Sequence, residues 1–127
     1  MSPQRGVTVD EVRVFALALP RTTEGYVRSR LRLRIGRIVY AGCSADETRL
    51  GFAFPREERA GLVAGEPHKF LLPKPSDLQF NWVVARMSEL DGTEMRELVL
   101  DAWRLVVPKR LAAQVGDDPL EQSATTR

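Results

Sequence analysis

The segment "VRSRLRLRIGRIVYAGC" (residues 27–43) constrains the fold more than any other part of the chain. Leucine and isoleucine alternate with arginine along it, which is the period-two pattern of a β-strand with one buried face. The "IGR" step places a glycine at the first central position of a two-residue loop, which suits a type II′ hairpin pairing Ile35 with Ile38. Strands joined by so tight a turn are antiparallel, so the sheet is expected to be antiparallel.

Helical segments flank the strands. Thr8 and Glu11 form a capping box ahead of a predicted helix over residues 9–19, and Asp91 with Glu94 repeats the pattern before the last helix. The predicted elements are a helix (9–19), three strands within 28–54, a short helix from Pro55 closed by Gly65 and Pro67, a short strand (68–73), a strand (80–87), and a helix that Pro108 ends or kinks, with "KRLAAQV" adding a turn or two.

The expected class is therefore α+β, a single antiparallel five-stranded sheet with helices on one face, in the order α-β-β-β-α-β-β-α. At 127 residues the chain fits one domain, which we place at residues 1–115. Residues 116–127 lack a sustained apolar period and are expected to form a frayed or disordered tail.

The alternation also assigns the two faces of the strands. Large apolar residues share the side expected to be the core, and arginines share the other side with small residues. The expected core side carries Leu31, Leu33, Ile35, Ile38, Tyr40, Leu50, Phe52 and Phe54, and the expected open side carries Arg30, Arg32, Arg34, Val39, Ala41, Cys43, Arg49, Gly51 and Ala53. The open side is predicted to be flat, basic and accessible.

Charge is concentrated on this region. Residues 21–37 hold six arginines and one acid, Glu24, a local charge of +5. Since the whole chain carries only +2, the remainder carries −3. A field concentrated on one element can steer an anionic partner even when the molecule is nearly neutral.

Two interpretations of the arginines stay open at this point. Alternate strand positions stand about 6.5 to 7 Å apart, close to the phosphate spacing of a nucleic acid strand, and guanidinium groups pair well with phosphate. Alternatively, the arginines keep an exposed sheet face in solution or form a subunit contact. Pairing with Glu24, Asp46 or Glu47 would favour that second interpretation.

Trp82 adds a condition to the first interpretation. In "FNWVVARM" neither side of the strand is clearly the core side. If Trp82 lies on the open face it is a stacking platform for a base, and otherwise it anchors the core or its rim. Trp103 lies in the apolar stripe of the last helix and is expected to be structural.

Nothing in the sequence indicates catalysis. His68 is the single histidine, Cys43 is the single cysteine, and neither has a neighbouring group at catalytic or ligand spacing. No Walker-type loop is present. We expect no enzyme activity, no cofactor and no metal site. The short apolar runs and the absence of a signal-peptide core predict a cytoplasmic protein without membrane spans.

Several motifs carry a family resemblance. The chain has "EG" after the first helix, then "IGRIVYA", "FAFPREER", "NWVVAR" and "ELVLDAWRLVVPKRLA". Over residues 8–115 it resembles the MmcQ/YjbR family of small bacterial proteins, most specifically at Ala102, Trp103, Pro108, Lys109 and Arg110. The resemblance implies a curved antiparallel sheet with helices on one side, similar to bacterial secretion chaperones, and predicted DNA binding. Where the family tends to have an aromatic or proline before the hairpin, this chain has "YVRSRLRLRI", which is more basic.

Together these observations predict a non-enzymatic protein that binds DNA or another polyanion without sequence-specific readout. The residues predicted to contact phosphates are Arg28, Arg30, Arg32, Arg34 and Arg37, with the patch extended by Arg49, Trp82 and Arg86. The alternative is a protein-interaction or chaperone-like adaptor module, including a homodimer formed through the same face.

Overall fold

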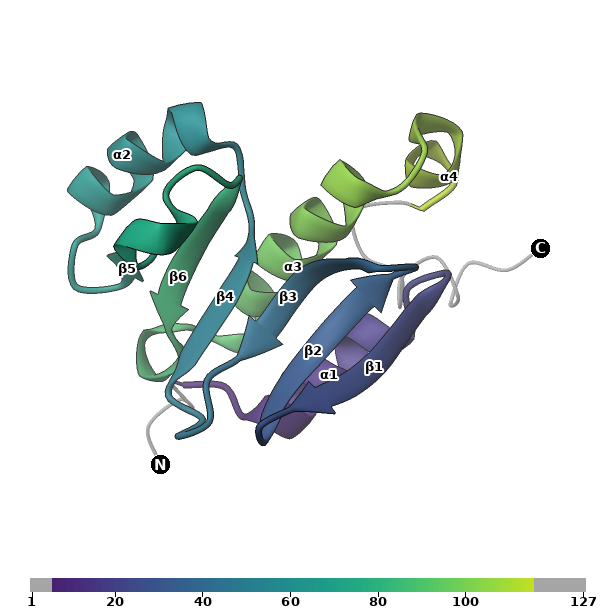
Figure 1. Cartoon of the computed structure of the whole chain (residues 1–127), viewed down its shortest axis with the longest axis horizontal. Helices are drawn as coiled ribbons and strands as arrows, with labels where there is room; N and C mark the ends of the chain where they lie inside the picture. The colour runs from purple at the N-terminus through teal and green to yellow at the C-terminus, as the bar shows by residue number, and fades with distance from the viewer. Residues whose placement is uncertain (1–5, 116–127) are drawn as a thin grey trace.

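The computed structural model describes residues 6–115 of the chain. One sheet, with helices around it, makes up the molecule (Figure 1). In chain order the elements are α1 (Val9–Leu17), β1 (Thr22–Val27), β2 (Arg30–Ile35), β3 (Ile38–Cys43), β4 (Arg49–Ala53), α2 (Arg56–Gly65), β5 (Phe70–Leu71), the 3₁₀ helix η1 (Pro75–Asp77), β6 (Trp82–Arg86), the 3₁₀ helix η2 (Met87–Glu89), α3 (Gly92–Val106) and α4 (Lys109–Ala113).

The sheet has six antiparallel strands in the order β1-β2-β3-β4-β6-β5. The α+β class is confirmed, but the prediction of five strands is wrong because β1 was not anticipated. Arg28 and Ser29 form the turn between β1 and β2, and both have a positive φ, 52° and 67°. Asparagine and glycine usually occupy such a turn, so the sequence "VRSR" did not indicate a hairpin. Arg28 consequently lies in a turn and not in a strand.

Local signals placed the other elements correctly. The capping box of α1 is present, with the Thr8 amide donating to Glu11 Oε1 (2.8 Å) and the Glu11 amide donating to Thr8 Oγ1 (3.1 Å). Gly36 has a φ of 60° and Ile35 pairs with Ile38, as the hairpin prediction required. Local turn and cap chemistry therefore define the strand and helix ends here.

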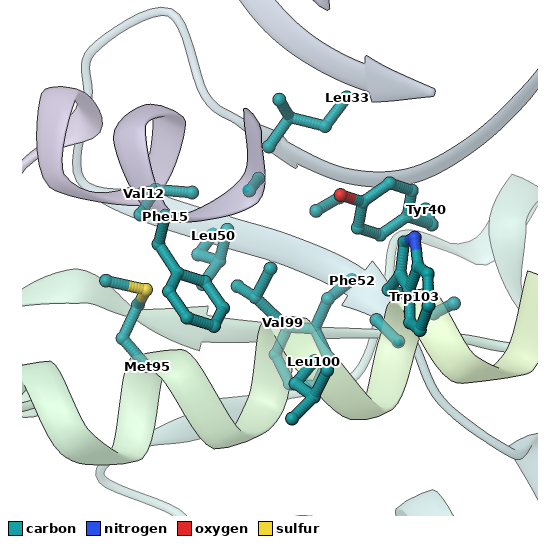
Figure 2. Close-up of a cluster of buried hydrophobic side chains, with 14 of the residues drawn as sticks. Val12, Phe15, Leu33, Tyr40, Leu50, Phe52, Met95, Val99, Leu100 and Trp103 are labelled. Carbon is teal, nitrogen blue, oxygen red and sulfur yellow. The ribbon is translucent and has the colours of Figure 1, made fainter. Parts of the chain in front are cut away.

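Helices α1 and α3 cover one face of the sheet, behind β1–β4 in Figure 1, and the core lies between them. Figure 2 shows the side chains that fill it, contributed by both helices and the central strands. Trp103 of α3 is fully buried, and its Nε1 donates to the Pro20 carbonyl (3.0 Å). The apolar stripe predicted for this helix thus faces the sheet, and its tryptophan is structural, as expected. Helix α2 contacts β5 and β6 at the other end of the sheet.

A β-bulge in β3 corrects the predicted faces. Leu33 pairs with Ala41 but Arg34 pairs with Val39, so Tyr40 is an extra residue in the strand. An extra residue reverses the alternation beyond it. Ala41 and Cys43, predicted on the open side, are instead buried at 0% and 2% exposure on the core side.

The same shift brings a different residue to the outer side of β3. Gly42 pairs with Arg32 on one side and with Gly51 on the other. The predicted core position of Tyr40 is correct, because its side chain is fully buried and its hydroxyl lies 2.8 Å from Thr22 Oγ1.

Two further predictions concern the extent and setting of the chain. The predicted tail, residues 116–127, lies outside the described residues. Between residues 6 and 115, no helix combines the length and apolar character that a membrane span requires.

Candidate functional site

The candidate site is the open face, defined here as the side of the sheet opposite α1 and α3. On β2, Leu31 and Leu33 are 2% and 0% exposed, so the intervening arginines project to the opposite side. Arg30, Arg32 and Arg34 therefore follow one another along the open face, as the alternation predicts. The cross-strand partners of these three arginines on β1 are Val27, Gly25 and Thr23.

Glycines make room for the large side chains of the open face. An added Cβ at Gly25 would lie 2.9 Å from Arg34 Nη1, and one at Gly42 would lie 3.0 Å from Arg32 Nη1. The two guanidinium groups therefore lie across neighbouring strands and do not project freely into solvent. Arg32 also donates from Nη1 to its neighbour's carbonyl, Leu31 O, at 3.2 Å.

None of the seven predicted arginines forms an ion pair within residues 6–115. Two of the acidic side chains considered as partners, Glu24 and Asp46, are bound elsewhere. Glu24 accepts from Arg13 of α1 through Nε (2.5 Å) and Nη2 (3.1 Å). Asp46 accepts from Ser44 Oγ (2.6 Å) and Thr48 Oγ1 (2.7 Å), which lowers the pKa of its carboxyl to about 2.

The arginines of β2 therefore act on one another. Burial lowers the pKa of the Arg32 guanidinium, and the adjacent charges of Arg30 and Arg34 lower it further. Arg49 of β4 lies directly opposite Arg86 of β6, a pairing of like charges. Closely spaced cations of this kind create a positive potential that a bound anion would relieve.

Trp82 lies on the open face. Its neighbours Val83 and Ala85 are fully buried, so the side chains of Trp82 and Val84 point to the other side of β6. The indole ring lies against Gly51 of β4, where an added Cβ would come within 2.7 Å of Nε1. That Nε1 is accessible and makes no hydrogen bond to residues 6–115. Trp82 therefore lies on the face of the sheet that a stacking role requires.

A groove of about 1060 Å³ runs along the open face. Its floor is formed by β3, β4 and β6, and its far wall by residues 72–81, called here the wall segment, together with the start of α2. The groove brings together Arg30, Arg32, Arg49 and Trp82 from the predicted set. Arg28, Arg34, Arg37 and Arg86 do not line it. Arg86 instead donates from Nε to the His68 carbonyl (3.1 Å).

The wall contributes residues that the sequence did not single out. Its basic members are Arg56 and Lys74, its acidic members are Glu57 and Asp77, and its exposed apolar members include Leu72 and Phe80. These residues lie about 20 to 50 positions beyond the arginines of β2, and no periodic pattern connects them. The one sequence feature that could have indicated this wall is Phe80, an aromatic residue among polar neighbours in "QFNW".

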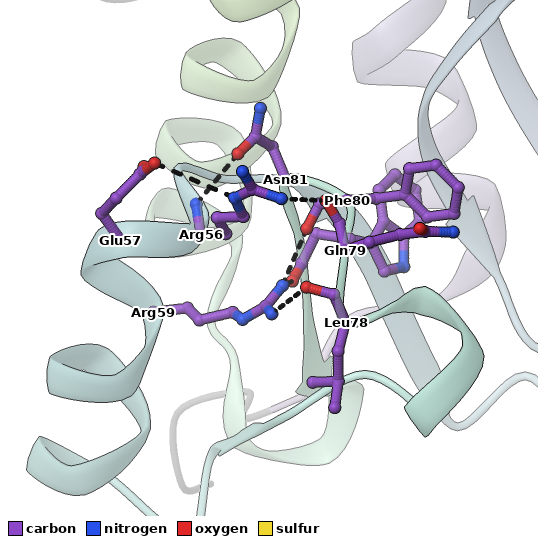
Figure 3. Close-up of polar contacts among 8 residues, drawn as sticks. Arg56, Glu57, Arg59, Leu78, Gln79, Phe80 and Asn81 are labelled. Atoms are coloured by element: carbon purple, nitrogen blue, oxygen red, sulfur yellow. Dashed lines mark hydrogen bonds and ion pairs between the residues drawn. The ribbon is translucent and has the colours of Figure 1, made fainter.

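Arg59 of α2 holds the wall segment in place. The residue is 8% exposed, and its guanidinium donates to the carbonyls of Leu78, Phe80 (2.8 Å) and Trp82 (3.1 Å). Arg56 adds a bond from Nη1 to the Gln79 carbonyl (2.5 Å). Figure 3 shows the backbone of residues 78–81 turned toward the two arginines, with the Phe80 ring pointing away from α2.

The residues considered for catalysis are not brought into an active arrangement. Burial raises the pKa of the Cys43 thiol to about 11, with a smaller effect from Glu47. His68 is exposed in the turn before β5. Among residues 6–115, no three His, Cys, Asp or Glu side chains are grouped to hold a metal ion.

Comparisons with known proteins agree with this architecture. The YjbR family model matches residues 17–105. A crystal structure of the Deinococcus radiodurans protein DR2400, which carries a DUF419 domain, is similar with a TM-score of 0.69. The two chains are 19% identical, over 92% of this chain and 94% of that one, so the likeness concerns the fold. No curated protein matches the chain.

Proposed function

The chain belongs to the YjbR family, and from the geometry of its sheet we propose that it binds nucleic acid, DNA in the first instance, through the open face without catalysing a reaction. One observation carries the proposal. Five of the predicted arginines lie on strands of the open face and two lie in the adjoining turns, and within residues 6–115 none of the seven forms an ion pair. Guanidinium groups that lack a protein carboxylate are available to phosphate oxygens.

The arrangement favours contact with the backbone over readout of sequence. Arg30, Arg32 and Arg34 follow one strand at regular spacing, and Arg37 lies in the turn that comes next in the chain. Regular cations match the repeat of phosphates, which carry no sequence information. Binding of this kind releases counterions and weakens as salt rises.

Fluorescence anisotropy with a labelled DNA over a range of salt concentrations tests the proposal. Five phosphate contacts predict a slope of log K against log salt of about −4.5. The charge-reversed variant Arg30→Glu/Arg32→Glu/Arg34→Glu should lose binding. The matched control Arg96→Glu/Lys109→Glu/Arg110→Glu changes net charge equally on α3 and α4 and should bind nearly as wild type does. Equal loss in both variants would contradict a role for the open face.

A second candidate is the binding of an acidic protein segment, including one from a second copy of the chain. The observation that favours it is the apolar part of the groove, where Ile38, Leu72, Phe80 and Leu105 are all more than half exposed. Light scattering separates the two candidates, because a homodimer through this face should dissociate in the charge-reversed variant. A monomeric wild type would exclude that dimer.

A further inference from the structure

We infer that the groove selects single-stranded nucleic acid over the duplex, with bases stacked on Trp82 and Phe80 and phosphates held by Arg30, Arg32 and Arg49. The inference rests on the proposed function and adds the class of nucleic acid to it. Its basis is that one groove joins an exposed phenylalanine, a partly exposed tryptophan and three arginines that form no ion pair within residues 6–115.

Trp82 provides a flat surface at the floor of the groove. Its ring is supported by Gly51, where any side chain would collide with it at 2.7 to 2.9 Å. The edge of the indole that carries Nε1 and Cζ2 therefore packs against Gly51, and the ring is held in place on the sheet. Trp82 is partly exposed and lines the groove, so part of the indole is available for a base to stack on.

Phe80 provides the second aromatic surface, and it is 55% exposed. On a mobile loop, an exposed phenylalanine would lose conformational entropy on binding. The backbone of the wall segment is instead fixed by hydrogen bonds. The carbonyls of residues 78–82 all accept hydrogen bonds, from Arg59, from Arg56 Nη1 and, at Asn81, from the Phe54 amide (3.1 Å). The conformational entropy of the wall segment is therefore lost on folding, and little further entropy is lost when a ligand binds.

Basic side chains line the same groove as these rings. Arg30, Arg32 and Arg49 line the floor on the β2–β4 side, and Arg56 and Lys74 line the wall. The acidic wall residues Glu57 and Asp77 also line the groove, and Glu57 lies 3.9 Å from Arg56. The net charge is therefore most positive on the sheet side, where we place the phosphates, and nearly balanced on the wall.

Strandedness follows from the joint presence of rings and cations. In a duplex the base faces are stacked on one another and are not available to aromatic side chains. Trp82 and Phe80 would therefore contribute no stacking energy to duplex binding. In an unpaired strand the bases turn out and stack on aromatic side chains while the backbone follows a basic groove. A volume of about 1060 Å³ is enough for a short stretch of such a strand.

Anisotropy with labelled oligothymidylate and with a duplex of the same length tests the inference. Wild type should bind the single strand more tightly. Phe80→Ala and Trp82→Leu should each weaken single-strand binding about 5- to 100-fold and leave duplex binding unchanged. Leu78→Ala is the matched control, because Leu78 is an exposed residue of the same segment that also accepts from Arg59 but does not line the groove.

Quenching of tryptophan emission supplies a second readout, which reports contact between the ligand and Trp82. Oligothymidylate should quench wild type and should not quench Trp82→Phe, because buried Trp103 is out of reach. Equal affinity for duplex and single strand, or equal loss of both in Phe80→Ala, would overturn the inference and leave polyanion binding in place. If the protein bound neither nucleic acid, or bound polyglutamate but no nucleic acid, the proposed function would be overturned.

Discussion

Three glycines decide where the large side chains of the open face lie. Arg34 lies against Gly25, Arg32 and the Leu31 carbonyl lie against Gly42, and Trp82 lies against Gly51, each so close that a Cβ would require a neighbour to shift. A glycine in a strand weakens the sheet and often marks such a close approach. The gain here is a low, flat surface in which long side chains lie along the sheet.

Asp46 interacts electrostatically with the nearby Arg49, although the two side chains do not form an ion pair. The hydrogen bonds from Ser44 and Thr48 lower the pKa of its carboxyl to about 2. A lowered pKa stabilises the fold above the ordinary carboxyl value near 4, and this contribution is lost as pH falls toward 2. We expect Asp46→Asn to be less stable than wild type at pH 7.

The difference between the two proteins should disappear between about pH 4 and pH 2. Denaturant unfolding across that range measures it. Asp10→Asn is the control, since the Asp10 side chain is 79% exposed and should show a smaller difference at pH 7. A difference that persists unchanged at pH 2 would contradict the assignment of the carboxylate as the stabilising acceptor.

At the scale of elements, the β1–β2 hairpin is the part of the sheet with the most strained turn. Ser29 has a φ of 67°, a conformation that costs a residue with a side chain about 1 to 2 kcal/mol. Ser29→Gly should therefore stabilise the protein by about 0.5 to 1 kcal/mol, after the entropy of glycine in the unfolded chain is subtracted.

Denaturant midpoints measure this change, and Ala45→Gly is the control. Ala45 lies in the exposed β3–β4 turn without a positive φ. Its replacement by glycine should give no stabilisation, because no backbone strain is relieved there. Stabilisation by both substitutions would show that turn strain is not the cause.

Helix α2 acts as a brace for the wall segment. The buried guanidinium of Arg59 donates to the carbonyls of Leu78, Phe80 and Trp82, so it binds three backbone acceptors and no carboxylate. Buried charges of this kind require full hydrogen bonding. The helix thus shapes the groove from outside it, through the backbone.

At the scale of the whole molecule, one core joins the central strands to α1 and α3. Cys43 of β3 is 2% exposed within it, and the pKa of its thiol is raised to about 11. We expect a thiol reagent at pH 8 to react only when the protein unfolds. The denaturant midpoint for thiol reaction should coincide with that for Trp103 emission, measured in Trp82→Phe.

Coincident midpoints are the signature of a single cooperative unit. Reaction of Cys43 well before loss of the Trp103 signal would mean that β3 opens separately from α3. The same experiment on Trp82→Phe with oligothymidylate present should raise both midpoints together, because a ligand of the folded state stabilises the whole unit.

Much of the fold could be predicted, and the failures have particular causes. The alternation on β2 placed Leu31 and Leu33 in the core, since each strand residue simply points opposite to its neighbour. The bulge at Tyr40 could not be predicted, because an extra residue is accommodated only when the neighbouring strands are in place. Arg28 and Ser29 hid the first hairpin, because their turn depends on pairing of the flanking strands.

The sequence by itself determined the antiparallel hairpin, the capped helices and the direction of the β2 arginines. Periodicity, capping and turn chemistry act over a few residues, so a linear reading suffices for them. Only the tertiary structure decided that Trp82 faces outward, that Glu24 and Asp46 are engaged elsewhere, and that α2 and residues 72–81 complete a groove. Those outcomes depend on which distant segments meet, and that is set by burial of the whole core and not by local pattern.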